Sequence, residues 1–169
     1  MGRMIPGAAG CGLALALVLA ALGCAKPLAT LDMFEPAAGP SVLKQPETES
    51  SASRSRRVVA IARRHLGARY VWGGASPFGF DCSGFVMYVY SHMGVALPHS
   101  AAKQYRYGTP VPRERLEPGD VVFFDGLGHN GIYIGDGRFI HARRSGHGVI
   151  ISGLDESWYR MRWVGGRRL

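Results

Sequence analysis

Cys82, in the segment Asp81-Cys82-Ser83-Gly84-Phe85, is the side chain of this 169-residue chain best suited to covalent chemistry. The other two cysteines, Cys11 and Cys24, lie within or directly after an apolar N-terminal segment. A domain left with one thiol cannot form an internal disulfide, so that thiol is reactive or pairs between molecules. The alternative is an inert cysteine buried as a small apolar side chain, which is the usual state of a free cysteine.

The residues that follow predict a helix over 82–92, with Asp81 as its N-cap and Gly94 as its stop. Cys82 would then stand in the first turn, where unpaired N–H groups and the helix dipole stabilise a thiolate. Thiols in such positions have pKa values lowered to roughly 3.5–7.5. We therefore expect Cys82 to be a nucleophile beside N–H groups that can hold an oxyanion. Gly84 is expected to let a substrate approach the backbone.

His129 is the base expected for this thiol, since it follows the glycine-containing loop 125–128 and opens a predicted strand. His141 lies in the next predicted strand. If 135–137 form a three-residue hairpin loop, residue 134 pairs with 138 and 131 with 141, so the two imidazoles share a face as diagonal neighbours. One imidazole can then take the thiol proton while the other orients it. A loop one residue shorter would put them on opposite faces.

Two other interpretations of the histidines must be weighed. Four of them, His65, His92, His99 and His147, are expected to be structural or exposed, although His99 follows Pro98 and could line a cleft. A set of one cysteine and two histidines can also bind zinc, but the chain has no Cys-x-x-Cys and no His-Glu-x-x-His spacing. We therefore expect no metal and no cofactor.

The elements that must position these residues predict an α+β fold. A first helix is expected over 56–66, capped by Ser53 or Ser55 and ended by Gly67, and a third, short one over 100–107. Short β-rich runs separated by glycine turns follow. Helices first and a mostly antiparallel sheet second are typical of α+β domains. The predicted strands are 120–124, 131–134, 138–142, 149–151 and 161–164.

Residues 1–23 predict an export signal, with a charge at Arg3 and an uncharged run over 11–23 that is short for a membrane span of about 20 residues. The run ends in Ala21-Leu22-Gly23-Cys24, which resembles a bacterial lipoprotein cleavage box. The alternative is an ordinary secretory signal. We expect an exported protein that is lipid-anchored through Cys24 and faces the periplasm. Ala25 after the cysteine, in place of Asp, favours the outer membrane.

Composition divides the rest of the chain into a tether and a single domain. Residues 24–55 are rich in Pro, Ser, Ala, Glu and Thr without a periodic apolar face, which predicts a flexible tether. Residues 56–169 suffice for one core. Without the leader, 19 basic face 12 acidic residues, so a charge of +7 favours attraction to a polyanion such as a cell wall. No aromatic-basic interleaving or zinc-finger spacing indicates a nucleic-acid partner. A monomer is expected.

Five segments together resemble, in order and spacing, the NlpC-type cell-wall cysteine endopeptidases, a papain-like family. The likeness covers about 58–169, and five segments in order are specific although each alone is weak. It implies a circularly permuted papain-like fold with the nucleophile at a helix N-terminus, and a triad of Cys82, His129 and His141. The segments are Tyr70-Val-Trp-Gly-Gly74, Phe80-Asp-Cys-Ser-Gly-Phe85, Pro118-Gly-Asp-Val-Val-Phe-Phe124, His129-Asn-Gly-Ile-Tyr-Ile-Gly135 and Phe139-Ile-His-Ala142.

The resemblance also implies a substrate class and further roles. It implies hydrolysis of peptidoglycan stem peptides or cross-links, at D-Ala–diaminopimelate or γ-D-Glu–diaminopimelate bonds. Tyr70 would line the site near the oxyanion, and Asp81 and Ser83 would contact substrate, although a helix cap explains Asp81 equally well. Asn130 departs from the common Val. The alternatives are a non-catalytic peptidoglycan-binding lipoprotein and an acyl- or amide-transfer enzyme on the same fold.

Overall fold

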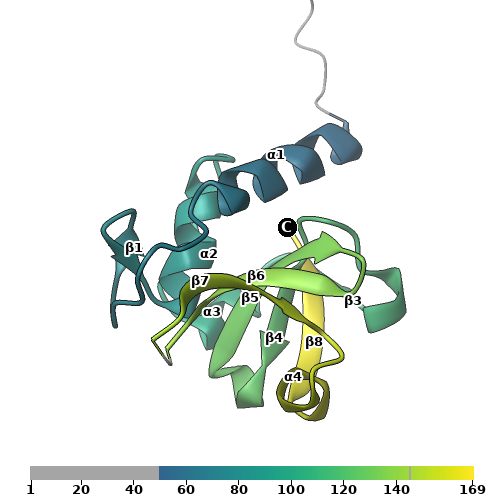
Figure 1. The fold of residues 1–169 in the computed structure, drawn as a ribbon. Coiled ribbons are helices and arrows are strands. Elements are labelled where there is room, and N and C mark those ends of the chain that lie inside the picture. The colour runs from purple at the N-terminus through teal and green to yellow at the C-terminus, as the bar shows by residue number, and fades with distance from the viewer. Residues whose placement is uncertain (1–49, 145) are drawn as a thin grey trace, which may run out of the picture. The chain divides into compact units, whose positions relative to one another are not determined.

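Helices at the start of the domain are followed by an antiparallel sheet (Figure 1). The computed structural model describes residues 50–144 and 146–169. The helices are α1 (Ser51–Arg63), α2 (Cys82–Ser91), α3 (Ala101–Gln104) and α4 (Ser157–Met161). The strands are β1 (Ala75–Ser76), β2 (Gly79–Phe80), β3 (Thr109–Val111), β4 (Val121–Phe124), β5 (His129–Gly135), β6 (Arg138–Arg143), β7 (Gly148–Gly153) and β8 (Trp163–Arg168).

The main sheet has the order β3-β8-β4-β5-β6-β7, and every neighbouring pair in it is antiparallel. β1 and β2 form a small separate hairpin. The α+β class is therefore confirmed, with each expected strand present at slightly different bounds. Four elements, β1, β2, β3 and α4, were not anticipated, because each is short and lacks a periodic apolar pattern.

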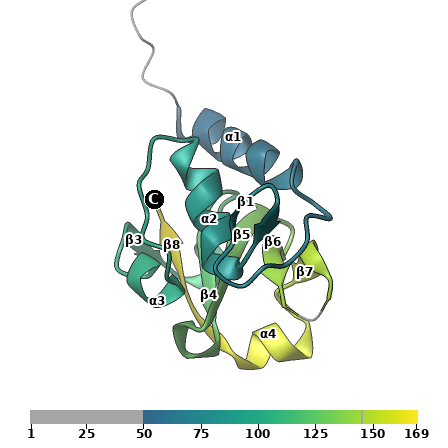
Figure 2. The same cartoon turned by 90° about the vertical axis from the view of Figure 1, so that its left-hand side faces the viewer.

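The sheet is covered on both faces, which is why all four residues of β4 are buried. On one face α2 packs against β5 and β6, and α1 packs against α2 and β5 (Figure 2). Val121 and Phe123 belong to the core on that face. Alternation along the strand sends Val122 and Phe124 to the opposite face, where they pack with Tyr159 of α4. The sheet is thus a rigid platform between α2 and α4.

Helix α1 begins earlier than expected. Its N-cap is Ser50, whose hydroxyl accepts a hydrogen bond from the N–H of Ser53 at 3.2 Å, so the expected start at residue 56 and the expected caps are wrong. The helix ends at Arg63 rather than 66. Residues 51–55 were assigned to the tether because they carry no periodic apolar face. They contain no Gly or Pro either, so a helix anchored by Val58 and Ala62 extends through them.

The predicted leader, Cys24 and most of the predicted tether fall outside the part of the chain that the structure describes. Within 50–144 and 146–169, none of the helices has the length and apolar composition needed to cross a bilayer.

The β5–β6 turn is shorter than expected. Asp136 and Gly137 have φ values of 53° and 68°, and Gly135 pairs with Arg138. Positive φ at both central residues defines a two-residue type I′ turn, for which Asp-Gly is a favoured sequence. The predicted three-residue loop and its 134–138 pairing are therefore wrong.

A bulge compensates for the missing loop residue. The ladder register shifts between Tyr133 and Gly135, which leaves one extra residue on β5. Below the bulge Ile132 pairs with Ile140, the register in which residue 131 lies opposite residue 141. His129 and His141 consequently share a face, as expected, although the turn that was to place them differs.

Candidate active site

Cys82 is the first residue of α2, and Asp81 caps that helix as expected. The Asp81 carboxylate accepts hydrogen bonds from the Gly84 N–H at 2.7 Å and the Ser83 hydroxyl at 3.1 Å through Oδ1. Its Oδ2 accepts from the Gly73 N–H at 3.0 Å. The Asp81 cap therefore holds the thiol at the N-terminal turn of a buried helix.

A further partner completes the surroundings of Asp81. His99 Nε2 lies 2.9 Å from both carboxylate oxygens, so this histidine lines the site, as its place after Pro98 suggested. The Asp81 carboxylate and the Ser83 hydroxyl, both expected to contact substrate, are thus bonded to other groups of the protein.

Gly84 has a packing role, and the expectation that it lets substrate approach the backbone is wrong. The glycine is buried, and a Cβ at this position would collide with the carbonyl oxygen of Gly74 and come within 2.8 Å of His99 Nε2. Absence of a side chain therefore allows the loop before β1 to close against the start of α2.

The Cys82 thiol is a neutral group in the resting structure. Burial raises its pKa above the ordinary value of 9.0, and the charge of Asp81 raises it further. Hydrogen bonds from the backbone N–H groups of Asn130, Ser83 and Cys82 act in the opposite direction. The expected lowering of the thiol pKa is therefore wrong, because Asp81 and desolvation outweigh the helix N-terminus.

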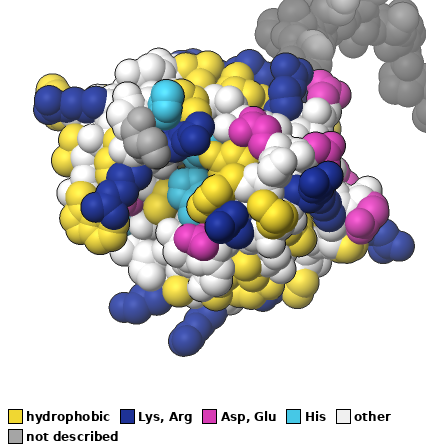
Figure 3. Space-filling view, turned by 60° about the horizontal axis from the view of Figure 1, so that its bottom comes forward, with side chains coloured by type: hydrophobic (Ala, Val, Ile, Leu, Met, Phe, Trp, Pro, Cys, Tyr) yellow, Lys and Arg dark blue, Asp and Glu magenta, His cyan; other side chains and the backbone are white. Residues whose placement is uncertain are grey.

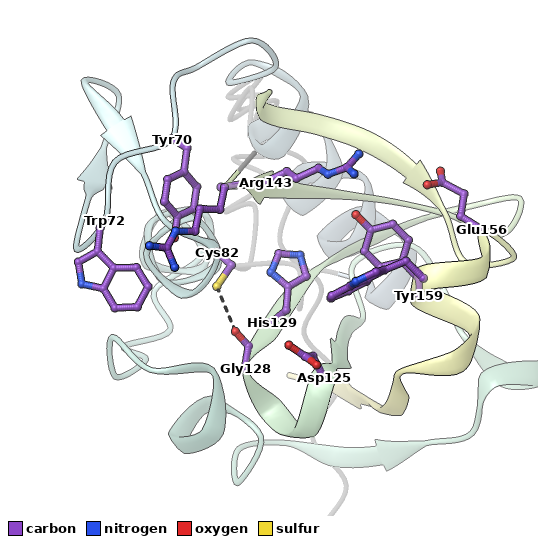
Figure 4. A pocket seen from close by; sticks show the side chains of 12 residues that line it. Tyr70, Trp72, Cys82, Asp125, Gly128, His129, Arg143, Glu156 and Tyr159 are labelled. Carbon is purple, nitrogen blue, oxygen red and sulfur yellow. Dashed lines mark hydrogen bonds between the residues drawn. The ribbon is translucent and has the colours of Figure 1, made fainter. Parts of the chain in front are cut away.

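His129 and His141 form the centre of a hydrogen-bonded chain beside this thiol. His129 Nε2 lies 2.8 Å from His141 Nδ1. His141 Nε2 in turn lies 3.0 Å from Ser152 Oγ and 3.2 Å from Tyr159 Oη. Figure 4 shows the His129 imidazole next to Cys82, whose Sγ is 3.9 Å from the Gly128 carbonyl oxygen. The structure thus brings together the three residues expected to form a triad.

Close approach of the strands seats His141. The residue opposite it is Gly131, and a Cβ there would come within 2.7 Å of the Ile140 carbonyl oxygen and 2.8 Å of His141 Cβ. Phe139 stacks on the His141 ring with 4.7 Å between ring centroids. His141 is fully buried, so its orientation is fixed by packing as well as by hydrogen bonds.

Both imidazoles are neutral near pH 7. Burial lowers the pKa of His129 to about 4; Asp125 raises this pKa and Arg143 lowers it. Burial also lowers the pKa of His141 well below 6.5, with His129 and Arg143 acting in the same direction. The resting pair is therefore thiol and imidazole rather than thiolate and imidazolium.

Sequence reasoning missed Ser152 and Tyr159. Ser152 is a single buried polar residue in the apolar strand β7, and this isolated hydroxyl was the available signal. Tyr159 comes from α4, which has five residues and no side-chain cap, so no local pattern pointed to it.

A network behind the nucleophile joins α2, α3 and β5. The Gln104 side-chain amide donates to the carbonyl oxygens of Ser83 at 2.9 Å and Pro98 at 2.8 Å. Its oxygen accepts from the Asn130 amide at 2.6 Å. Both side chains are buried. Asn130, which stands where Val is common, therefore supports the backbone whose N–H faces the Cys82 sulfur.

Two hollows meet at Cys82, Tyr70, Trp72 and Gly128. One, of about 340 Å³, extends past His129 to Asp125, Arg143 and the α4 residues Trp158 and Tyr159. The other, of about 410 Å³, extends past Asp81 and His99 to the start of α3. Figure 4 places Tyr70 and Trp72 on one side of the thiol and His129, Asp125 and Tyr159 on the other. A chain molecule laid across Cys82 could occupy both.

Two basic side chains, Arg143 and Arg144, line the first hollow. Figure 3 shows Lys and Arg spread over a face on which a histidine is visible in a recess. Among the residues described, no group of three or more His, Cys, Asp or Glu side chains is arranged to hold a metal ion. The first hollow is lined by the thiol, the His129 imidazole, aromatic rings, two guanidinium groups and the carboxylates of Asp125 and Glu156.

Comparison with known proteins gives one consistent result. Residues 67–168 match the NlpC/P60 family. A probable endopeptidase p60 of Listeria seeligeri is 46% identical over 92 residues, which cover 53% of this chain and 18% of that protein. A probable endopeptidase of Mycobacterium tuberculosis is 46% identical over 101 residues, covering 59% and 26%. The match thus spans about a fifth to a quarter of the length of these curated relatives.

Solved structures with the same fold include at least three at more than 30% identity, among them the following two. An NlpC/P60 family protein from Bacillus cereus has a TM-score of 0.65 and 38% identity, covering 68% of this chain and 39% of that one. The NlpC/P60 domain of the peptidoglycan hydrolase SagA has a TM-score of 0.62 and 32% identity, covering 68% and 98%.

Proposed function

Because the chain belongs to the NlpC/P60 family, we propose that it is a cysteine endopeptidase that hydrolyses peptide bonds in peptidoglycan stem peptides or cross-links. The observation that carries the proposal is the meeting of Cys82, His129 and His141 at one cavity. Names of relatives add support, since several are called endopeptidases or peptidoglycan hydrolases. No cofactor is required by this chemistry.

Because the Cys82 thiol and the His129 imidazole are both neutral before substrate binds, the proton moves from one to the other only during the attack. Nδ1 of His129 takes the proton of Cys82 as the sulfur attacks the scissile carbonyl carbon, because Nε2 is already bonded to His141. Backbone N–H groups at the start of α2 and the phenol of Tyr70 hold the developing oxyanion. Burial raises the pKa of Tyr70, so this phenol keeps its proton. Imidazolium then protonates the leaving amine, and water hydrolyses the thioester.

His141 is a positioning residue in this scheme. For His129 Nδ1 to carry a lone pair, its Nε2–H must donate to His141 Nδ1. His141 Nε2–H then donates to the hydroxyl groups of Ser152 and Tyr159. Replacing His141 with alanine should give a large partial loss of kcat, whereas Ser152→Ala and Tyr159→Phe should give smaller losses. Unchanged kcat in His141→Ala would remove it from the triad.

The scissile bond is D-Ala–diaminopimelate or γ-D-Glu–diaminopimelate, and the same triad serves both. The family resemblance implies, for some members, that the residue corresponding to Asp81 recognises the free amino end of a stem peptide. In this structure the Asp81 carboxylate is already hydrogen-bonded to His99, to two backbone N–H groups and to one hydroxyl group. This favours substrates whose stem peptide is still attached to the glycan and has no free amino end.

Muropeptide digestion tests the proposed activity. Purified cross-linked and uncross-linked muropeptides are incubated with residues 50–169 or with the matched Cys82→Ala variant. The masses of the products are then measured by mass spectrometry. New peptide termini that depend on Cys82 support an endopeptidase, and their masses name the bond. If the folded wild-type domain cleaves neither substrate, or Cys82→Ala cleaves as well as wild type, the proposal fails.

The competing functions give different products. A non-catalytic peptidoglycan-binding lipoprotein would retain muropeptides without new termini, and an acyl- or amide-transfer enzyme would pass the acyl group to an amine rather than water. Thiol alkylation separates these poorly, because the raised pKa of Cys82 makes slow alkylation the expected result even for a catalytic thiol.

The proposed location is the periplasmic face of a membrane, with the outer membrane favoured, and the anchor is a lipid on Cys24. The support is the apolar run before Gly23-Cys24 and the absence of Asp after the cysteine. Labelled palmitate should be incorporated into the full chain and not into Cys24→Ser. Equal labelling of both, or none, would contradict the anchor.

A further inference from the structure

Arg143 stands at the end of β6, two residues after His141, and lines the cavity that contains Cys82 and His129. Residues two apart on a strand point to the same face. The partly buried Arg143 therefore extends the face that carries the two histidines, and the exposed Arg144 follows it at the rim.

No hydrogen bond or ion pair joins the Arg143 guanidinium to any other residue in the described part of the chain. Arg144 also lacks a carboxylate partner there, and its guanidinium lies 5.4 Å from the centroid of the exposed Trp72 ring. By contrast, Arg162, which directly follows α4, faces the cavity residue Asp125 at 3.6 Å. Among the described residues, the two guanidinium groups that line the cavity of Cys82 are thus without a carboxylate partner.

The carboxylates around the cavity are committed elsewhere. Asp125 faces Arg162, and Glu156 Oε1 accepts a hydrogen bond from the Gly153 N–H at 2.7 Å. Neither carboxylate is within bonding distance of Arg143. A guanidinium that is partly removed from water without a counter-ion is unfavourable for folding. Its charge also opposes protonation of both histidines. Packing gives no reason for this arrangement, whereas binding an anion does.

We propose that Arg143, flanked by Arg144, binds a free carboxylate of the substrate that lies next to the scissile bond. This inference rests on the proposed function and deepens it. Both candidate bonds have such a group: the α-carboxylate of D-Glu in one, and the diaminopimelate carboxylate beside the linking nitrogen in the other. A planar guanidinium can hold either one through two parallel hydrogen bonds.

Carboxylate binding would also strengthen the base. Burial is the main cause of the lowered pKa of His129, and the charge of Arg143 lowers it further; a bound anion offsets this second effect, so the imidazole accepts the thiol proton more readily once the correct substrate is in place. An amidated substrate offers no negative charge and would leave the base weak. Amidation should therefore lower both binding and kcat.

Matched muropeptides test the subsite. Wild type, Arg143→Gln and Arg144→Gln are compared on substrates with all carboxylates free, with only D-Glu amidated, and with only diaminopimelate amidated. Wild type should lose at least tenfold in kcat/KM on one of the amidated substrates, which names the carboxylate. Arg143→Gln should lose at least tenfold on the free substrate and discriminate little between free and amidated forms. Arg138→Gln is the control, because Arg138 is on the same strand but exposed and paired with Asp136 at 3.2 Å.

Binding gives a readout that does not depend on turnover. In a Cys82→Ala background, calorimetric titration with the free-carboxylate muropeptide should show at least tenfold weaker binding when Arg143 is Gln, and no change when Arg138 is Gln. Equal binding of free and both amidated muropeptides would overturn the subsite even if the chain cleaves all of them. Absence of cleavage with retained carboxylate discrimination would instead overturn the proposed function and leave the subsite standing.

Discussion

At the scale of single residues, the site is a chain of neutral hydrogen-bonding groups rather than a preformed ion pair. The thiol pKa is raised by burial and Asp81, and the His129 pKa is lowered by burial. In the proposed reaction, proton transfer must therefore accompany attack on the carbonyl. The hydroxyl groups of Ser152 and Tyr159 lie where they can fix the tautomer that leaves a lone pair facing the sulfur.

This arrangement predicts the pH dependence of turnover. His129 stays unprotonated, and so competent as a base, down to its pKa of about 4, while Cys82 keeps its proton beyond pH 9. The pH profile of kcat/KM should therefore be flat from about pH 5 to 8 and fall on the acid side near 4. An acid limb centred near 6.5, with the fold intact by circular dichroism, would contradict a buried neutral base.

The site residues that could be predicted from the sequence differ from the others in being recognisable by their type. Cys82, His129 and His141 stand out because a thiol and imidazoles are recognisable by type and by their place at element boundaries. Ser152, Tyr159 and Arg143 have common side chains whose meaning comes only from their neighbours in space. The sign of the thiol pKa shift was missed for the same reason, since desolvation depends on packing.

At the scale of elements, the β5–β6 hairpin decides whether the two histidines meet. A two-residue turn alone would put them on opposite faces, because side chains alternate along a strand. The bulge between Tyr133 and Gly135 adds the residue that restores the register. Gly135 has a φ of 95°, where a side chain is unfavourable.

Gly135→Ala should therefore lower stability by about 1–2 kcal/mol and reduce kcat at least tenfold, because relief of the strained φ shifts the ladder. A steric clash is not the cause, since the atom nearest to the new Cβ would be 3.6 Å away. Urea unfolding and steady-state kinetics measure the two effects. Gly137→Ala, with a φ of 68° beyond the bulge, is the control and should lose similar stability with kcat unchanged. If kcat falls by the same factor in both variants, the bulge is not what sets the register of the two strands.

Element types were predictable where local chemistry decides them. Asp81 as cap, the α2 helix and the main strands follow from capping and apolar patterns. The helix start at Ser51, the turn length, β3 and α4 did not follow, because they depend on contacts made after folding. The Asp-Gly pair was a turn signal that favoured the two-residue loop, whereas the bulge beside it had no separate signal.

At the scale of the whole molecule, the buried histidines link folding to pH. Each has a folded-state pKa below its unfolded value of 6.5, so their contribution to stability is present above 6.5 and is lost as pH falls towards the folded value. For His129 alone, the difference between the unfolded pKa of 6.5 and the folded pKa of about 4 corresponds to a loss of about 3 kcal/mol of folding stability at low pH.

The free energy of unfolding should accordingly fall by at least this order between pH 6.5 and 4, as measured by denaturant titration at each pH. His129→Gln should have a shallower dependence, since it removes one of the two titrating groups. A wild-type stability that is constant over this range would show that the imidazoles are not buried in the neutral form.

The positions of α1 and α4 also determine at which end of the domain the cavity lies. In both Figure 1 and Figure 2, α1 and α4 lie at opposite ends of the domain, and α4 forms part of the rim of the cavity at Cys82. The chain enters the domain at Ser50, the cap of α1. The rim that α4 contributes to the cavity therefore lies at the end of the domain remote from Ser50, where the chain enters it.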